Sequence, residues 1–299
     1  MTTTAAATKT RVAFKNILFA TDFSPSAEAA LPYAIGLAKQ YGAKVHGLHV
    51  RFPATYPIVG PEAMPQIMEA AEEQAKLEAQ QLHQLLASVP HAVTISEGDL
   101  WPTLKEIVNK EQVDLVVMGT HGRKGVSRAL LGSAAEEVFR KASCPVLTVG
   151  PHVSHNTERR MAMKQILFAT DFSAESLAAL PFAVSLAQEH QSNLTLLNVT
   201  GKQEVGELVH AGQYKESTLR RLHGLVPAGA ELWCQPKCRV EHGAEAEKII
   251  EVAIALGADL IVLGVHAPQG GVGATTHLLR SIAHQVVADA QCPVLTIRA

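Results

Sequence analysis

Short apolar runs alternate with longer amphipathic segments along this chain. The run NILFAT at residues 16–21 is nearly continuous in apolar character, as in a parallel strand that is buried on both faces. Ser24 and Pro25 follow it, and a capping serine before a proline is a typical helix start. The pattern predicts further strands at residues 44–50, 92–98, 114–119 and 145–149, with helices over 61–87 and 102–110 and from 133. This alternation predicts an α/β fold: an open parallel sheet with right-handed crossovers and helices on both faces.

The chain contains the same segments twice. KNILFATDFS at 15–24 returns as KQILFATDFS at 164–173, DLVVMG at 114–119 as DLIVLG at 259–264, and CPVLTV at 144–149 as CPVLTI at 292–297. A repeat of this length indicates a domain duplication. We predict a first domain over residues 1–150, a polar linker over 151–163 and a second domain over 164–299. Pro32 and Pro181 fall inside the first predicted helix of each domain, so a kink is expected in both.

The two CPVLT segments predict a pair of edge strands. An edge strand leaves backbone N–H and C=O groups unpaired, and pairing with a like strand satisfies them. We therefore expect the two fifth strands to join the domains as an internal pseudo-dimer, with a homodimer as the alternative assembly.

Composition excludes several classes of protein. Hydrophobic residues make up 47% of the 299 residues and charged residues 18%, which is enough apolar material for two cores. The net charge of −2 gives no basic field for nucleic acid or a membrane surface, and no apolar run is long enough to span a bilayer. The four cysteines form no disulfide framework, and the N-terminal segment has no apolar stretch of signal-peptide length. We expect a cytoplasmic protein.

A glycine-rich segment with basic residues, GTHGRKGVSRALLGS at 119–133, carries the main chemical signal. Ligands of open α/β sheets bind beyond the carboxyl ends of strands, at the point where the strand order reverses. Asp22 ends the first predicted strand and Gly119 the fourth, so both would face one crevice if these strands are neighbours. The segment leads into a helix near Ser133, whose first N–H groups suit a phosphate. The alternative is that the glycines serve only a turn and a helix start.

The spacing Gly119-x2-Gly122-x9-Gly132-Ser133 resembles the ATP-binding motif of the universal stress protein family, and the ATDFS and CPVLTV segments fit the same family. The resemblance covers nearly the whole chain, twice. It implies a five-stranded sheet of order 3-2-1-4-5 in each domain, an adenine nucleotide alpha hydrolase-like fold, and ATP with Mg²⁺ as the ligand. Carried over, Asp22 contacts the adenosine and the Val50 backbone the adenine edge, while Gly119, Gly122, Arg123, Gly132 and Ser133 surround the ribose and phosphates. Ala20, Thr21 and Met118 complete the predicted site.

The second copy departs from this motif. Ala267 stands in place of the second glycine, Arg280 in place of Gly132, and three residues are inserted before the last strand. Glycines at 270, 271 and 273 could still supply N–H donors. We expect one strong site, in the first domain. A side chain at Gly132 should fill the space of the phosphate and force an unfavourable backbone angle.

Signatures of common enzymes are missing from the sequence. It has no P-loop motif, no G-x-G-x-x-G after the first strand and no G-x-S-x-G elbow, and we assign no catalytic residue. The spacing Cys234-x3-Cys238-x3-His242 is not a common zinc pattern, so we expect no metal site. The leading hypothesis is a regulatory or stress-protective ATP-binding protein. The alternatives are a slow ATPase that uses backbone donors and Arg123, and a ligand-free interaction module.

Overall fold

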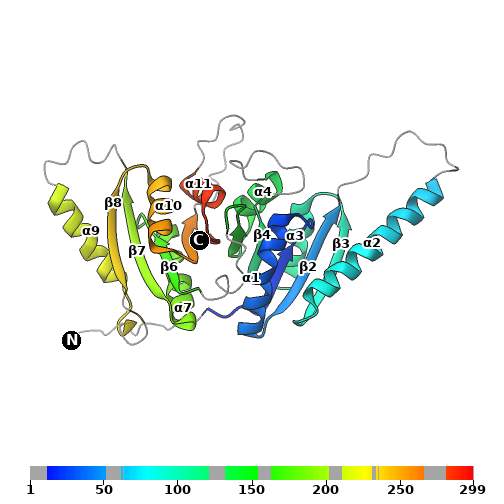
Figure 1. Ribbon diagram of the computed structural model, residues 1–299, viewed down its shortest axis with the longest axis horizontal. Coiled ribbons are helices and arrows are strands. Elements are labelled where there is room, and N and C mark those ends of the chain that lie inside the picture. The colour runs from blue at the N-terminus through cyan, green and yellow to red at the C-terminus, as the bar shows by residue number, and fades with distance from the viewer. Residues whose placement is uncertain are drawn as a thin grey trace.

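The chain forms one long twisted sheet with helices on both faces, as the computed structural model shows (Figure 1). The structure describes residues 12–51, 62, 64–120, 132–153, 163–201, 211–230, 234, 236–265 and 281–298. The first half contains β1 (Asn16–Ala20), α1 (Pro25–Tyr41), β2 (Lys44–Arg51), α2 (Met64–Leu86), β3 (His91–Glu97), α3 (Leu100–Lys110), β4 (Leu115–Gly119), α4 (Ser133–Lys141) and β5 (Val146–Val149). The second half contains β6 (Gln165–Ala169), α6 (Ala174–Ala178), α7 (Leu180–His190), β7 (Asn193–Thr200), α9 (Ala211–Leu225), β8 (Lys237–His242), α10 (Glu245–Leu256), β9 (Leu260–Val265), α11 (Ile282–Asp289) and β10 (Val294–Arg298).

The strand order confirms the predicted architecture. The sheet runs β3-β2-β1-β4-β5-β10-β9-β6-β7-β8, so each half has the order 3-2-1-4-5. All pairings within a half are parallel, and β5 and β10 pair antiparallel. The prediction of two open five-stranded parallel sheets is therefore correct, with the addition that the two are joined into one ten-stranded sheet.

The junction between the halves is locally symmetric. Leu147 of β5 lies opposite Leu295 of β10. The Thr148 hydroxyl donates to the Val294 carbonyl at 3.1 Å, and the Thr296 hydroxyl returns the same bond to the Val146 carbonyl at 3.2 Å. Each edge strand thus supplies hydrogen-bond partners for the backbone groups of the other, as the argument from the CPVLT segments predicts. A further contact crosses the junction where the Arg298 guanidinium of β10 donates to the Phe139 carbonyl in the last turn of α4, at 2.9 Å.

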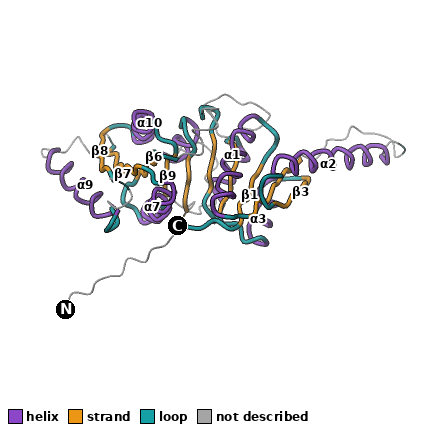
Figure 2. Tube along the Cα trace, turned by 60° about the horizontal axis from the view of Figure 1, so that its bottom comes forward, coloured by secondary structure: helices purple, strands orange, loops and turns teal. Residues whose placement is uncertain are grey.

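Strand β1 is apolar from Ile17 onward because both of its faces are covered. Ile17 and Phe19 pack into the core beneath α1 and α2, while Leu18 and Ala20 pack into the core beneath α3 and α4. Ile17, Leu18 and Phe19 are at most 1% exposed. The second half repeats the arrangement, with α10 on one side of its strands and α7 and α9 on the other (Figure 2). Within the described ranges, no helix combines the length and apolar character that a membrane span requires.

The first helix differs between the halves. Ser24 caps α1 by accepting a hydrogen bond from the Ala27 N–H, and Pro25 occupies the first turn, both as predicted. Helix α1 is continuous through Pro32, whereas the corresponding segment of the second half is divided at Ala179 into α6 and α7. Pro181 then lies in the first turn of α7, where its missing N–H costs no helical hydrogen bond. Of the two kinks expected at Pro32 and Pro181, the second half has a helix break before Pro181, whereas α1 is not interrupted at Pro32.

Gly119 is required by a close backbone approach between β4 and the start of α1. A Cβ atom at this position would lie 2.6 Å from the Ser26 carbonyl carbon and 2.7 Å from the Ala27 nitrogen. Gly264 of β9 meets Glu175 and Ser176 of α6 in the same way. Both neighbours are backbone atoms, which cannot move aside as a side chain can. The glycine at the end of this strand therefore has a packing role in both halves.

We predict that Gly119→Ala lowers the free energy of unfolding by about 1–3 kcal/mol, because the added methyl group overpacks this contact. Gly224→Ala is the matched control: position 224 lies within α9, and a Cβ atom there meets no atom within 4 Å. The control should raise stability by about 0.5–1 kcal/mol, since alanine is the better helix former. Urea denaturation of both variants measures the difference, and equal stabilities would contradict the packing role.

Candidate functional site

The strand order reverses between β1 and β4, where the sequence places the site. Ala20 of β1 lies beside Met118 of β4 in the register, and β2 pairs with the other edge of β1. Gly119 is the last residue of β4, and Asp22 lies two residues after the end of β1, at the same carboxyl edge of the sheet. The condition for one shared crevice is therefore met.

The turn between β1 and α1 is fixed by a series of side-chain bonds. The Thr21 hydroxyl accepts the Phe23 N–H at 2.9 Å, and the Asp22 carboxylate accepts the Ser24 N–H at 3.0 Å. Phe23 has a φ of 58°, in the left-handed region that a bulky residue rarely adopts. Because Ser24 caps α1, the Asp22 carboxylate serves the turn rather than the helix. Asp22 is half-buried.

A charged cluster beneath this turn was not anticipated from the sequence. Glu78 of α2 is 8% exposed, and its carboxylate lies 3.8 Å from His49 Nε2 and 3.9 Å from Arg51 Nε. The Arg51 guanidinium also pairs with Glu97 at 3.1 Å and donates to the Ala71 carbonyl at 2.8 Å. His49 and Arg51 are two residues apart on β2 and so share one face, which is the sequence signal that could have revealed the cluster.

A hydrogen bond joins the two residues that flank positions 121–131 of the predicted ligand loop. Thr120 is fully buried, and its N–H donates to the Val149 carbonyl at 3.0 Å. The Gly132 N–H donates in turn to the Thr120 carbonyl at 2.9 Å. This bond, the neck between Thr120 and Gly132, holds the start of α4 at the carboxyl edge of β4.

The structure locates part of the predicted phosphate-binding set. Gly122 and Arg123 lie outside the described residues. Gly132 is the N-cap of α4, no side chain caps this helix among the described residues, and Ser133 is exposed in its first turn. Glu136 is also in the first turn, and its Oε1 atom lies 3.9 Å from the Nη1 atom of Arg140.

One expectation about Gly132 is wrong. Its backbone angles, φ −63° and ψ 145°, are open to any residue, so a side chain there would cause no backbone strain. Any requirement for glycine at this position must come from the space beside the helix start.

The second half has the same turn after its first strand, but the helix before its fifth strand starts with a different residue. Thr170 and Asp171 accept the N–H groups of Phe172 and Ser173 at 2.9 Å, and Phe172 has a φ of 65°. Burial acts to raise the pKa of Asp171, but the hydrogen bonds from Ser173 and Ser176 outweigh it and the pKa is lowered.

Helix α11, the counterpart of α4, is capped by the side chain of its N-cap residue, Ser281. The Ser281 hydroxyl accepts the His284 N–H at 3.2 Å. Residues 267, 270, 271, 273 and 280 of the altered motif lie outside the described residues.

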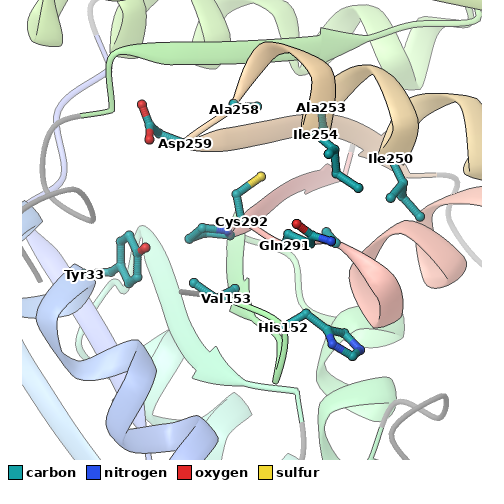
Figure 3. Close-up of a pocket in the computed structure, with 13 residues that line it drawn as sticks. Tyr33, His152, Val153, Ile250, Ala253, Ile254, Ala258, Asp259, Gln291 and Cys292 are labelled. Carbon is teal, nitrogen blue, oxygen red and sulfur yellow. The ribbon is translucent and has the colours of Figure 1, made fainter. Parts of the chain in front are cut away.

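A cavity of about 250 Å³ lies at the junction of the halves, away from the predicted site (Figure 3). Tyr33 of α1 and His152 and Val153 after β5 face Asp259 and Cys292, which precede β9 and β10. Burial, reinforced by the Asp259 carboxylate, raises the pKa of the Cys292 thiol to about 12. This thiol is therefore protonated at neutral pH and is a poor nucleophile.

No metal-binding group is evident where the structure gives side-chain positions. Cys234, Cys238 and His242 all fall within the described residues, and no three His, Cys, Asp or Glu side chains there are grouped to hold an ion. Burial raises the pKa of both Cys234 and Cys238, which disfavours the thiolate that a metal requires.

Comparison with known proteins identifies the family. The model of the universal stress protein family matches residues 13–150 and again 163–298. A universal stress protein of Mycolicibacterium smegmatis is 28% identical over 297 residues, covering 94% of this chain and 96% of its own. One from Methanocaldococcus jannaschii is 31% identical over 140 residues, covering 46% of this chain and 82% of its own.

A solved structure supports the fold. The crystal structure of a universal stress protein from Archaeoglobus fulgidus superposes with a TM-score of 0.68 at 22% identity, and the match covers 96% of this chain and 97% of that one. Because the family model matches two successive segments that together span nearly the whole sequence, the chain belongs to the universal stress protein family as a tandem, two-domain member.

Proposed function

We propose that the first domain binds ATP, together with Mg²⁺, and that the protein is a regulatory or stress-protective nucleotide-binding protein of the cytoplasm. The observation that carries the proposal is the neck between Thr120 and Gly132. It holds the start of α4, which has a glycine cap, at the switch point of the sheet beside the Asp22 turn. Family membership supports the same function.

The start of α4 suits a phosphate because its first N–H groups point outward and carry a partial positive charge. A glycine cap has no hydroxyl or carboxylate to compete for these donors. The adenosine would lie towards Asp22 and the backbone of Val50, on the β2 side of the crevice. The residues that we assign to the nucleotide are Ala20, Thr21, Asp22, Val50, Met118, Gly119, Gly122, Arg123, Gly132 and Ser133.

The second domain should bind nucleotide weakly or not at all. The Ser281 hydroxyl already accepts one N–H of the α11 first turn, which removes a donor that a phosphate would use. The basic residues Arg123 and Lys124 also have no basic counterparts in the second copy.

We further propose that the antiparallel pairing of β5 with β10 acts as an internal pseudo-dimer interface in solution. The proposed cytoplasmic location agrees with four cysteines that are all free.

Calorimetric titration with Mg-ATP should give about one strong site per chain, because only the first domain combines a glycine cap with the basic loop. Asp22→Ala should weaken this site. Two sites of equal affinity would contradict the proposed asymmetry, and no binding at millimolar ATP would favour a ligand-free interaction module.

Gly132→Ser should weaken ATP binding about tenfold, because a serine cap competes with the phosphate for a backbone donor. Folding should be unimpaired, since the backbone at Gly132 accepts any side chain and a serine cap favours the helix. Titration gives the affinity, and thermal denaturation gives the stability.

Gly132→Ala is the control, because it adds a Cβ atom without a hydrogen-bond acceptor. Equal losses of affinity in both variants would assign the effect to crowding instead of capping. A serine variant that binds ATP as tightly as the parent would show that the phosphate does not lie at the start of α4.

A further inference from the structure

His49 forms a hydrogen bond with the carbonyl group of Thr21, the residue that precedes Asp22 in the turn. Its Nδ1 atom lies 2.8 Å from the Thr21 carbonyl oxygen. A carbonyl can only accept a hydrogen bond, so Nδ1 carries the proton in this contact. The imidazole is 4% exposed, and its ring centroid lies 4.8 Å from that of Phe23. One side chain therefore contacts the residues on both sides of Asp22.

The second half makes the same bond with a different residue. Asn198 occupies the position of His49 in β7, and its Nδ2 donates to the Thr170 carbonyl at 2.8 Å. Asn198 is 6% exposed. The two halves thus share a buried side-chain donor to this carbonyl although the donor residue has changed. This is the pattern expected if the bond, and not the imidazole, is what the turn needs.

The surroundings of the two donors differ in charge. In the first half, Glu78 lies four residues before the buried Leu82 of α2 and approaches His49 Nε2 to 3.8 Å. In the second half, the neutral and buried Thr218 lies four residues before the buried Leu222 of α9. The donor to the threonine carbonyl therefore has a carboxylate beside it in the first half, where the matching position of the second half holds a hydroxyl.

The contact between His49 and Glu78 is not itself a hydrogen bond. Glu78 Oε2 is buried without a hydrogen-bond partner among the described residues, and 3.8 Å exceeds hydrogen-bonding distance. The approach of the two groups is therefore a contact between α2 and β2 that is separate from the bond to the Thr21 carbonyl. The role of His49 in the turn and its role beside Glu78 can thus be separated by substitution.

We propose that His49 is a positioning residue for the nucleotide site: its Nδ1–H bond to the Thr21 carbonyl sets the direction in which Asp22 faces the crevice. The proposal rests on the proposed ATP site of the first domain. His49 acts through Thr21 and Asp22 and makes no contact with the ligand. Any side chain that places an N–H donor at the same point can replace it.

The test compares two substitutions of similar size. His49→Asn introduces the residue of the second half and keeps the donor, whereas His49→Leu removes it. We expect His49→Leu to weaken ATP binding about tenfold, the loss of one buried hydrogen bond, and His49→Asn to stay within about twofold of the parent. Both variants remove the imidazole from Glu78, so both should lose stability in urea. A merely structural role would instead make affinity follow stability, and equal losses of affinity in the two variants would overturn the proposal.

A double-mutant cycle locates the effect. In an Asp22→Ala background, His49→Leu should cause little further loss of affinity, because its action passes through Asp22. Full additivity of the two losses would overturn the proposal. Asn198→Leu is the matched control in the second half and should leave the affinity of the first domain unchanged.

Amide hydrogen exchange provides a readout that does not depend on nucleotide. His49→Leu should speed exchange at Phe23 and Ser24, whose N–H groups bond within the turn, and His49→Asn should not. Unchanged exchange in His49→Leu would overturn the positioning role. If exchange responds as expected while the parent chain binds no ATP, the ATP proposal fails and the positioning of the turn by His49 stands.

Discussion

The antiparallel pairing of β5 with β10 is the interaction on which the arrangement of the molecule depends. A parallel sheet needs helices on both faces, which leaves only its edges open to another chain or domain. Here two edges satisfy each other, and the two threonine hydroxyls return the same bond across the junction. One hydrophobic core runs beneath both halves as a result, from Phe14 through Leu147 and Leu295 to Leu196. The pairing also places the carboxyl ends of β5 and β10 at opposite ends of their shared ladder.

The duplicated halves show which parts of the site are fixed and which have changed. Both turns after the first strand have the same left-handed phenylalanine, the same threonine and aspartate acceptors and a buried donor to the threonine carbonyl. The helix that follows the fourth strand differs, since Gly132 caps one copy and Ser281 the other. The turn is therefore a property of the fold, whereas the helix cap is where the two halves diverge.

The sequence predicts the sheet well because its determinants are local. Continuous apolar runs mark the strands, and the Ser24-Pro25 pair marks the start of α1. Apart from the pairing of the two CPVLT strands, features that depend on contacts between distant segments could not be predicted. The packing role of Gly119 arises only when β4 meets α1, and the approach of Glu78 to His49 needs α2 folded against β2. The cavity beside Cys292 requires both halves to be in place.

The closed neck between Thr120 and Gly132 bears on how such a site can evolve. Because one hydrogen bond joins Thr120 to Gly132, the length of the sequence between them should hardly affect the strands on either side, and the entropy cost of closing such a loop grows only slowly with its length. The second copy has three more residues between Gly264 and Cys292 than the first has between Gly119 and Cys144, and it still forms β9, α11 and β10. Segments with new ligand preferences could thus be exchanged at this point while the sheet remains unchanged. A tandem protein can test such exchanges in one half while the other keeps its original loop.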